Sequence, residues 1–203
     1  MARKSIWSML CLALLLALVL GCQPMGKVDQ GRVVDFNKET NTLTMIRDIS
    51  PDPATPDYSF LPPVTYVLPK DPNESGAEPK PGKRMKLDTK NRQIVIYVPN
   101  VQNFATINYT LVEQKENVQA NDPLVYDEAE GKARKFPAVD KTRKTITIYS
   151  KRQAILTTFS VPDEYFMLPA DTWDNGDEAR IYYKEPGKAA RYMNITKTDI
   201  FKK

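Results

Sequence analysis

Hydrophobic and polar residues alternate along three stretches of the chain, and a short polar run interrupts each stretch. In the first stretch, residues 31–45, apolar side chains at Val34, Phe36, Leu43 and Met45 lie on either side of such a run. An apolar residue at every second position predicts a strand with one buried face, and the polar run predicts a turn between two strands. Each stretch is therefore expected to form a β-hairpin.

The three stretches also resemble one another in sequence. Residues 31–45 align without a gap with residues 82–96, and a third copy, residues 131–149, follows after a two-residue shift. The matching apolar positions include Leu43, Ile94 and Ile146. Thr, Val, Ile and Tyr at these positions favour strands, and helical spacing is poor throughout. A repeat at this spacing predicts a chain built from similar β units.

The segment after the hairpins repeats as well, because residues 108–133 align without gaps with residues 164–189. The stretches Gly176–Tyr182 and Gly187–Tyr192 resemble the last strands of small five-stranded barrels, OB-like or SH3-like, that occur in tandem in secreted bacterial proteins. The layout is also similar to Gram-negative lipoproteins of about this length whose families carry no assigned activity. The resemblance implies an all-β fold of tandem small antiparallel β-barrels built from repeated β-hairpins.

The expected domain organisation is two modules, residues 28–104 and residues 105–203. One continuous meander of three hairpin units is the alternative topology. The first module carries a proline-rich insertion, residues 50–81, and proline cannot donate a hydrogen bond to a sheet ladder. Its two proline-rich parts, residues 50–63 and 70–81, are expected to form exposed loops, with a partner-binding polyproline segment as the alternative.

The N-terminus has the features of a secretory signal peptide, expected as a helix over residues 1–21. Arg3 and Lys4 precede an uncharged apolar run that ends at Gly21. An uncleaved membrane anchor is the alternative, although the run is short for a membrane span. The ending Val19-Leu20-Gly21-Cys22 resembles the lipobox of bacterial lipoproteins.

The lipobox resemblance implies cleavage before Cys22 and attachment of a diacylglycerol and acyl chains such as palmitate at that cysteine. Gln23, rather than aspartate, follows the cysteine, which by the same resemblance implies sorting to the outer membrane. The chain is therefore expected at the cell envelope, bound to the outer membrane through Cys22 and facing the periplasm.

The composition excludes several classes of function. The chain contains no histidine, and its two cysteines lie at or before the predicted cleavage point, so the usual ligands of zinc, haem and blue copper are missing. Ser-His-Asp and Cys-His catalysis are excluded for the same reason. Without Arg3 and Lys4 the chain has 27 basic and 25 acidic residues, a balance that indicates no nucleic-acid partner. We therefore predict no cofactor, metal site or catalytic residue.

Aromatic residues gather toward the C-terminal end of the chain, where exposed rings could stack on a sugar or a peptide. The set comprises Tyr165, Phe166, Trp173, Tyr182, Tyr183 and Tyr192. Core packing explains part of such a set. Trp173 stands in a polar stretch, residues 171–176, so it is the candidate expected to be exposed, with Tyr165 and Tyr183 as weaker binding candidates.

Acidic residues offer two further hypotheses. Asp171, Asp174, Asn175 and Asp177 are oxygen donors at close spacing, which suits either Ca²⁺ or local turn hydrogen bonds, and turn chemistry is favoured. A carboxylate pair for glycoside hydrolysis could come from Glu128, Glu130, Glu178 and Glu185. We predict a lipid-anchored binding or structural module with an envelope protein or glycan as partner; the alternative is a carboxylate-dependent hydrolase of envelope glycans.

Overall fold

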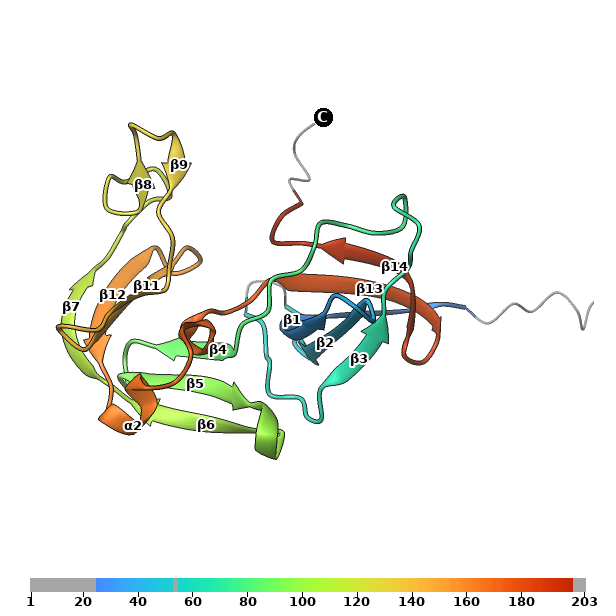
Figure 1. Cartoon of the computed structure of the whole chain (residues 1–203), viewed down its shortest axis with the longest axis horizontal. Helices are drawn as coiled ribbons and strands as arrows, with labels where there is room; N and C mark the ends of the chain where they lie inside the picture. Colours follow the sequence, from blue (N-terminus) through green and yellow to red (C-terminus); the bar gives the residue numbers. More distant parts are fainter. Residues whose placement is uncertain (1–24, 53–54, 199–203) are drawn as a thin grey trace, which may run out of the picture.

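The computed structural model describes residues 25–52 and 55–198, which form two β lobes (Figure 1). The predicted signal peptide and Cys22 lie outside the described residues. Regular structure within the described ranges is nearly all strand, as the alternating pattern predicts. No helix in these ranges is both long and apolar enough to cross a membrane.

One lobe is a closed five-stranded barrel, on the right in Figure 1, with the strand order β1-β13-β14-β3-β2. Its strands are β1 (Lys27–Asn37), β2 (Thr42–Arg47), β3 (Val64–Val67), β13 (Glu178–Glu185) and β14 (Lys188–Asn194). The pairs are antiparallel except for the short parallel contact between β14 and β3. Alternate side chains point inward, and Val33, Leu43, Met45 and Ile181 are fully buried in the barrel core.

The other lobe packs two sheets around a second core. One sheet contains β4 (Arg84–Asp88), β5 (Gln93–Val98) and β6 (Asn103–Asn108), and the other has the order β10-β11-β12-β7. The strands of the second sheet are β7 (Thr110–Lys115), β10 (Ala138–Asp140), β11 (Thr145–Ser150) and β12 (Ile155–Ser160). Ile94 and Ile96 from the first sheet and Ile146 and Phe159 from the second share one buried cluster.

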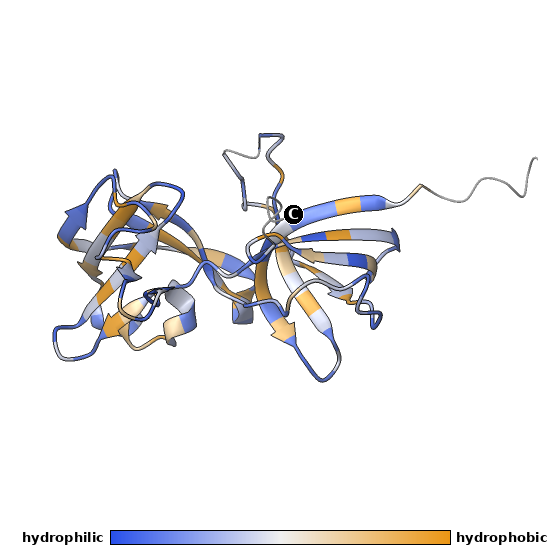
Figure 2. Cartoon of the chain, turned by 90° about the horizontal axis from the view of Figure 1, so that it is seen from above, coloured by the Kyte–Doolittle hydropathy of each residue, from blue (hydrophilic) through white to orange (hydrophobic). Residues whose placement is uncertain are grey.

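Short elements complete this second lobe. They are the 3₁₀ turns η1 (Pro99–Val101) and η2 (Ala170–Trp173), the ribbon of β8 (Tyr126–Asp127) and β9 (Lys132–Ala133), and the one-turn helix α2 (Asp163–Phe166). Figure 2 shows the hydrophobic residues concentrated in the strands of both lobes and hydrophilic residues at the connecting turns. The second lobe is thus built from two sheets, and the all-β fold class predicted from the sequence is confirmed.

The three predicted hairpins form with the same turn geometry. Asn37 pairs with Thr42, Asp88 with Gln93 and Asp140 with Thr145. In each turn the first side chain, Asn37, Asp88 or Asp140, accepts backbone N–H groups of the turn. The last turn residue has positive φ in every case, at Asn41, Arg92 and Lys144. Turn chemistry that is local in sequence therefore sets the register of all three hairpins.

The predicted division into residues 28–104 and 105–203 is wrong, because one barrel takes strands from both ends of the chain. Strands β1 to β3 alone would leave two unpaired edges, and the hairpin β13–β14 pairs with both. One barrel strand, β3, lies within the proline-rich insertion. Hydrophobic periodicity predicts that a segment is a strand, but it carries no information on a distant pairing partner.

The two lobes are joined by two crossing segments that approach closely. The N–H of Gly82 donates to the carbonyl of Val33, and the N–H of Arg84 donates to the carbonyl of Asp174. A Cβ atom on Gly82 would lie 2.2 Å from the nitrogen of Gly176, and Gly176 itself has a φ of +65°. Both positions require glycine, because a side chain would collide with the neighbouring backbone. The absence of side chains there lets the two segments approach closely enough for their backbones to form hydrogen bonds.

A small third cluster of buried side chains packs across the junction. Val34 and Ile46 come from β1 and β2, whereas Met85 and Tyr97 come from β4 and β5. Val34 and Met85 are the bulge residues of matching hairpins, each left out of the strand pairing. Tyr58, from the proline-rich segment, completes the cluster. The two matching hairpins thus pack against each other at the junction.

Candidate functional site

Trp173, the predicted exposed binding residue, is fully buried in the second lobe. Its ring lies edge-on to Phe159, with 6.4 Å between ring centroids, and its backbone carbonyl accepts a hydrogen bond from Nε of Arg84. The prediction of an exposed contact is therefore wrong. A polar stretch of sequence surrounds the ring, but the residues that cover it come from other strands.

Tyr165 and Tyr183, the other predicted binding residues, are half-buried in different lobes. Tyr165 lies on α2 and packs against the core cluster of the second lobe. Tyr183 lies on β13 and its ring is 5.2 Å from that of Tyr66 in the barrel. The three predicted aromatic residues therefore do not form one binding surface.

The aspartates of the predicted polar loop make local hydrogen bonds and ion pairs. Oδ1 of Asp174 accepts the N–H of Gly176, and Oδ2 of Asp177 accepts Nδ2 of Asn194 at 2.7 Å. Lys80 pairs with Asp174, and Asp171 pairs with Lys83. Within residues 25–52 and 55–198 no group of three or more acidic or thiol side chains is arranged to hold a metal ion. These carboxylates stabilise the junction.

A cleft of about 940 Å³ lies at the junction of the lobes, and sequence reasoning did not identify it. Its wall combines residues of β1, β4, β13, the proline-rich segment and the turn between β11 and β12. The basic residues among those that line it are Arg32, Arg84, Lys86, Lys151 and Arg152, and the acidic one is Glu178. The excess of positive charge makes the cleft suited to an anion.

Arg84 is the most deeply placed cation of the cleft, with 7% of its surface exposed. Within the described residues its side chain makes one hydrogen bond, from Nε to the carbonyl of Trp173 at 2.9 Å, and no ion pair. Burial and the nearby charge of Arg32 lower the pKa of Arg84 to about 10, with the carboxylate of Asp174 opposing them, so the guanidinium remains charged at neutral pH. Its two Nη groups therefore retain donors without protein partners in the described chain.

Arg32 approaches the same region from β1. Its Nη1 donates to the carbonyl of Arg84 at 3.3 Å, and its guanidinium lies over the ring of Tyr58, 4.3 Å from the centroid. Nε of Arg32 and the hydroxyl of Tyr58 are both buried without a hydrogen-bond partner among the described residues. Burial also raises the pKa of Tyr58. Buried polar atoms without a partner in the described chain also occur in the core of the second lobe, at Tyr109 and Trp173, so what sets this region apart is that two arginines meet beside an open cleft.

The sequence alignment contained one signal of this site. When residues 31–45 are aligned with residues 82–96, Val33 falls on Arg84. The strand registers agree, because Val33 pairs with Met45 and Arg84 pairs with Ile96. A charged residue thus replaces a buried valine at a matching strand position. Such a departure from the apolar pattern marks a position where packing alone does not explain the residue.

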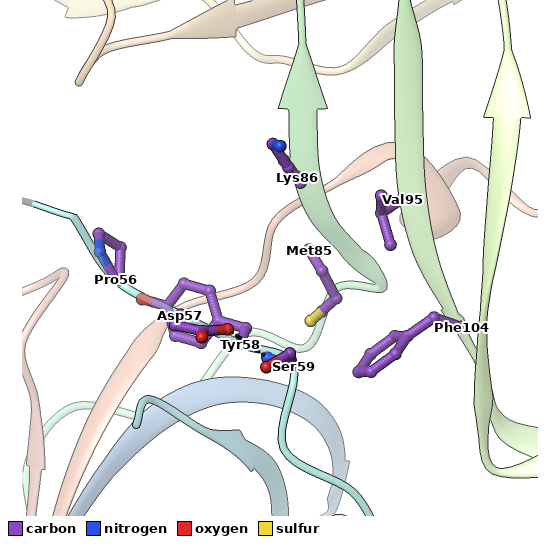
Figure 3. Close-up of a pocket in the computed structure, with 8 residues that line it drawn as sticks. All are labelled: Pro56, Asp57, Tyr58, Ser59, Met85, Lys86, Val95 and Phe104. Atoms are coloured by element: carbon purple, nitrogen blue, oxygen red, sulfur yellow. Dashed lines mark hydrogen bonds between the residues drawn. The ribbon is translucent and has the colours of Figure 1, made fainter. Parts of the chain in front are cut away.

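A second, smaller pocket of about 380 Å³ adjoins the cleft. Figure 3 shows Met85 on β4 and Phe104 on β6 converging toward the segment that carries Tyr58 and Ser59. Pro56 and Val95 extend its apolar wall. Asp57, Ser59 and Lys86 are its polar lining residues, and the carboxylate of Asp57 accepts the N–H of Ser59. The pocket is therefore mainly apolar.

The glutamates considered for hydrolysis lie in separate places. Glu178 lines the cleft, and its Oε1 accepts a hydrogen bond from Nε2 of Gln30. Glu130, in the β8–β9 turn, pairs with Lys132, and Glu185 pairs with Lys188 at the far end of the barrel. Glu128 is exposed in the same turn as Glu130. The cleft thus has one lining carboxylate among the described residues.

Comparison with known proteins identified one family. The family described as Domain of unknown function (DUF4881) matches residues 24–203 of the chain. No curated protein and no solved structure showed a significant match. The match spans both lobes, so the barrel, the junction and the cleft all fall within the family domain.

Proposed function

The chain belongs to the family described as Domain of unknown function (DUF4881), and we propose that this member is a lipid-anchored binding protein of the cell envelope whose ligand occupies the basic cleft. One observation carries the proposal. Among the described residues the buried side chain of Arg84 makes a single hydrogen bond and no ion pair, although a buried charge without an ion-pair partner normally destabilises a protein. A bound anion would supply the missing partner.

The place where β1 begins supports a lipid anchor near the N-terminus. Lys27 pairs with Tyr183, whereas Arg32, at the cleft, pairs with Glu178. Five residues of strand correspond to roughly 17 Å, so β1 begins at the end of the barrel remote from the cleft and from the second lobe (Figure 1). An anchor attached through Cys22 would leave the cleft open toward the periplasm.

The alternative of a carboxylate-dependent glycan hydrolase receives less support from this geometry. Such enzymes place two carboxylates about 5 to 10 Å apart around the bond that they cleave. The cleft offers Glu178 alone among its lining residues, and Arg84 and Arg32 lie nearby. An arrangement with several cations and one carboxylate is better suited to holding an anion than to cleaving a glycoside.

The anchor is tested by the substitution Cys22→Ser. Cells grown with labelled palmitate should incorporate label into the wild-type chain and none into the variant, and the variant should leave the outer-membrane fraction, because acyl chains contribute about 0.8 kcal/mol per buried methylene. Unchanged labelling or unchanged membrane partition of the variant would refute the anchor. Recovery of the wild type mainly in inner-membrane fractions would refute outer-membrane sorting.

The role of the cleft is tested with a photoreactive amino acid placed in two matching turns. Gln153 lines the cleft in the β11–β12 turn, whereas Thr142 occupies the exposed β10–β11 turn. Irradiation of cells should give a mass adduct at position 153 that is absent at position 142. Equal adducts at both positions, or none at either, would contradict ligand binding in the cleft.

A further inference from the structure

We propose that the ligand is an amphipathic anion, with its carboxylate or phosphate group at Arg32 and Arg84 and its hydrocarbon part in the pocket beside Met85. This inference rests on the proposed function and names the chemical class of the ligand. It depends on three features: the contact between the cleft and the pocket, the free donors at one end, and the apolar wall at the other.

The cleft and the pocket adjoin each other and share part of their walls. Pro56, Tyr58, Met85 and Lys86 line both. Tyr58 presents its ring to Arg32 and also contributes to the pocket, so it lies between the charged and the apolar regions. Both volumes, about 940 and 380 Å³, fall within the range of cavities that bind small molecules. A single ligand can therefore extend from one to the other.

The charged end of the site is arranged for a planar or tetrahedral oxyanion. The hydrogen bond from Nε of Arg84 to Trp173 holds the guanidinium, and the two Nη groups remain available to a ligand. Guanidinium groups bind carboxylate and phosphate through two parallel hydrogen bonds, which are stronger than neutral ones. Nη1 of Arg32 donates to the backbone carbonyls of Arg84 and Met85, which holds the Arg32 guanidinium beside Arg84.

The mouth of the cleft carries further positive charge. Lys151 and Arg152 are exposed in the β11–β12 turn, and neither makes an ion pair with another described residue. Lys86, at the boundary with the pocket, pairs with the carboxylate of Asp88 at 3.2 Å. The mouth therefore attracts anions, and the buried arginines provide the directed contacts.

The apolar end of the site distinguishes an amphipathic ligand from an inorganic ion. Met85 and Phe104 project into the pocket from two strands of one sheet, and Val95 lies between them (Figure 3). A flexible thioether adapts to hydrocarbon chains of varied shape. An inorganic anion would contact only the arginines and would leave this wall in contact with water.

The test uses the full chain and two photoreactive probes that differ only in charge. One probe is a fatty acid with a diazirine in its chain, and the other is the corresponding alcohol. Peptide mapping after irradiation locates each adduct, so labelling of other surfaces is counted separately from labelling of the pocket. The acid should label peptides that contain residues 56–59 or 85–104 about tenfold more than the alcohol, because a charge-assisted hydrogen bond contributes at least one tenfold step in affinity.

Two double variants with the same change in net charge separate the cleft from the general surface. Lys151→Glu with Arg152→Glu reverses the charge at the cleft mouth and should lower labelling by the acid about tenfold. Lys141→Glu with Arg143→Glu, in the exposed β10–β11 turn, should leave labelling unchanged. A monoacyl phosphate carrying the same diazirine shows whether phosphate replaces carboxylate, and inorganic phosphate should compete only weakly.

The outcomes separate this inference from the proposed function. Equal labelling by acid and alcohol, or an equal loss in both double variants, would overturn recognition of the anionic group. Complete competition by inorganic phosphate would overturn the role of the apolar pocket. If neither probe labels the pocket while position 153 still captures a ligand in cells, the amphipathic class is wrong and the binding function stands.

Discussion

The hairpins β1–β2 and β4–β5 share their local structure but serve different parts of the molecule. Both turns begin with a side chain that accepts backbone N–H groups, end at a residue of positive φ, and follow a strand with one bulge. The two hairpins differ at the position two residues after their matching glycines, Gly31 and Gly82. Val33 is fully buried in the barrel core, whereas Arg84 lies at the cleft. The same local pattern thus contributes to a closed core in one lobe and to the wall of a cleft in the other.

The surroundings of the two positions explain why one holds valine and the other arginine. In the barrel, neighbouring strands surround the inward side chain at Val33 on all sides. In the second lobe, the matching side chain lies where the crossing segments meet, and the cleft is open beside it. Arginine is compatible with the second environment because its long side chain can pack along its length while its donors face the cleft.

The largest expected effect comes from exchanging the residues at this matching position. Val33→Arg should lower the free energy of unfolding by about 3–5 kcal/mol, because the closed core offers the charge no partner. Arg84→Met should change it by no more than about 2 kcal/mol, since removal of a buried charge without an ion pair in the described chain offsets the lost hydrogen bond to the Trp173 carbonyl. Urea denaturation of each variant measures both values. A loss of several kcal/mol in Arg84→Met would show that Arg84 is a structural residue.

Truncation of the buried strand positions tests whether the hairpins contribute similar cores. Leu43→Ala, Ile94→Ala and Ile146→Ala should each cost about 2–5 kcal/mol, because all three side chains are fully buried. Thr44→Ala removes a side-chain hydrogen bond to Thr65 and should cost about 1 kcal/mol. Denaturation midpoints give the comparison. Similar small losses at the apolar and the threonine positions would contradict the observed register.

Substitution at two glycines of positive φ separates the junction from an exposed turn. Gly176→Ala should cost about 2–4 kcal/mol, because its Cβ would lie 2.4 Å from the carbonyl oxygen of Val33 in addition to the strained φ of +65°. Gly131→Ala, with a φ of +61° and its nearest atom 4.0 Å away, should cost only the backbone strain of about 1–2 kcal/mol. Thermal unfolding of both variants measures the difference. Equal costs would mean that the junction yields to accommodate a methyl group.

The smallest expected effect concerns pH and the first residues of the two matching turns. Hydrogen bonds from Asn91 lower the pKa of Asp88 to about 2, whereas Asn37 in the first hairpin does not titrate. The stabilisation from Asp88 is therefore complete above the unfolded-state pKa of about 4 and is lost as the pH falls toward 2. Asp88→Asn should lose less stability than the wild type between pH 5 and pH 2.5 in denaturant titrations. Parallel pH profiles for the two chains would exclude this contribution.

Local features of the fold were predictable from the sequence. The alternating residues of β2, β5 and β11 show the expected burial, and the predicted polar runs form turns. These features depend on neighbours within a few residues, through side-chain alternation and turn hydrogen bonds. Trp173 shows the limit of such reasoning. Its neighbours in sequence are polar, but Phe159 packs against its ring from strand β12.

The candidate site was predictable only as an anomaly. Alignment of the hairpins places Arg84 on Val33, which marks Arg84 as unusual. It does not indicate that Arg32 from β1, Arg152 from the β11–β12 turn and Glu178 from β13 line the same cleft. Those residues are distant in sequence, and only the crossing of the two segments at the junction brings them together.

The sequence by itself determined which segments become strands, which face of each is buried, and where the hairpins turn, because these properties follow from side-chain alternation and local backbone chemistry. The tertiary structure decided which strands pair over long distances. The hairpin β13–β14 closes the barrel begun by β1 to β3, since pairing satisfies the backbone groups of both open edges. That closure brings β13–β14 back to the first three strands and creates the junction, and the basic cleft exists only as its consequence.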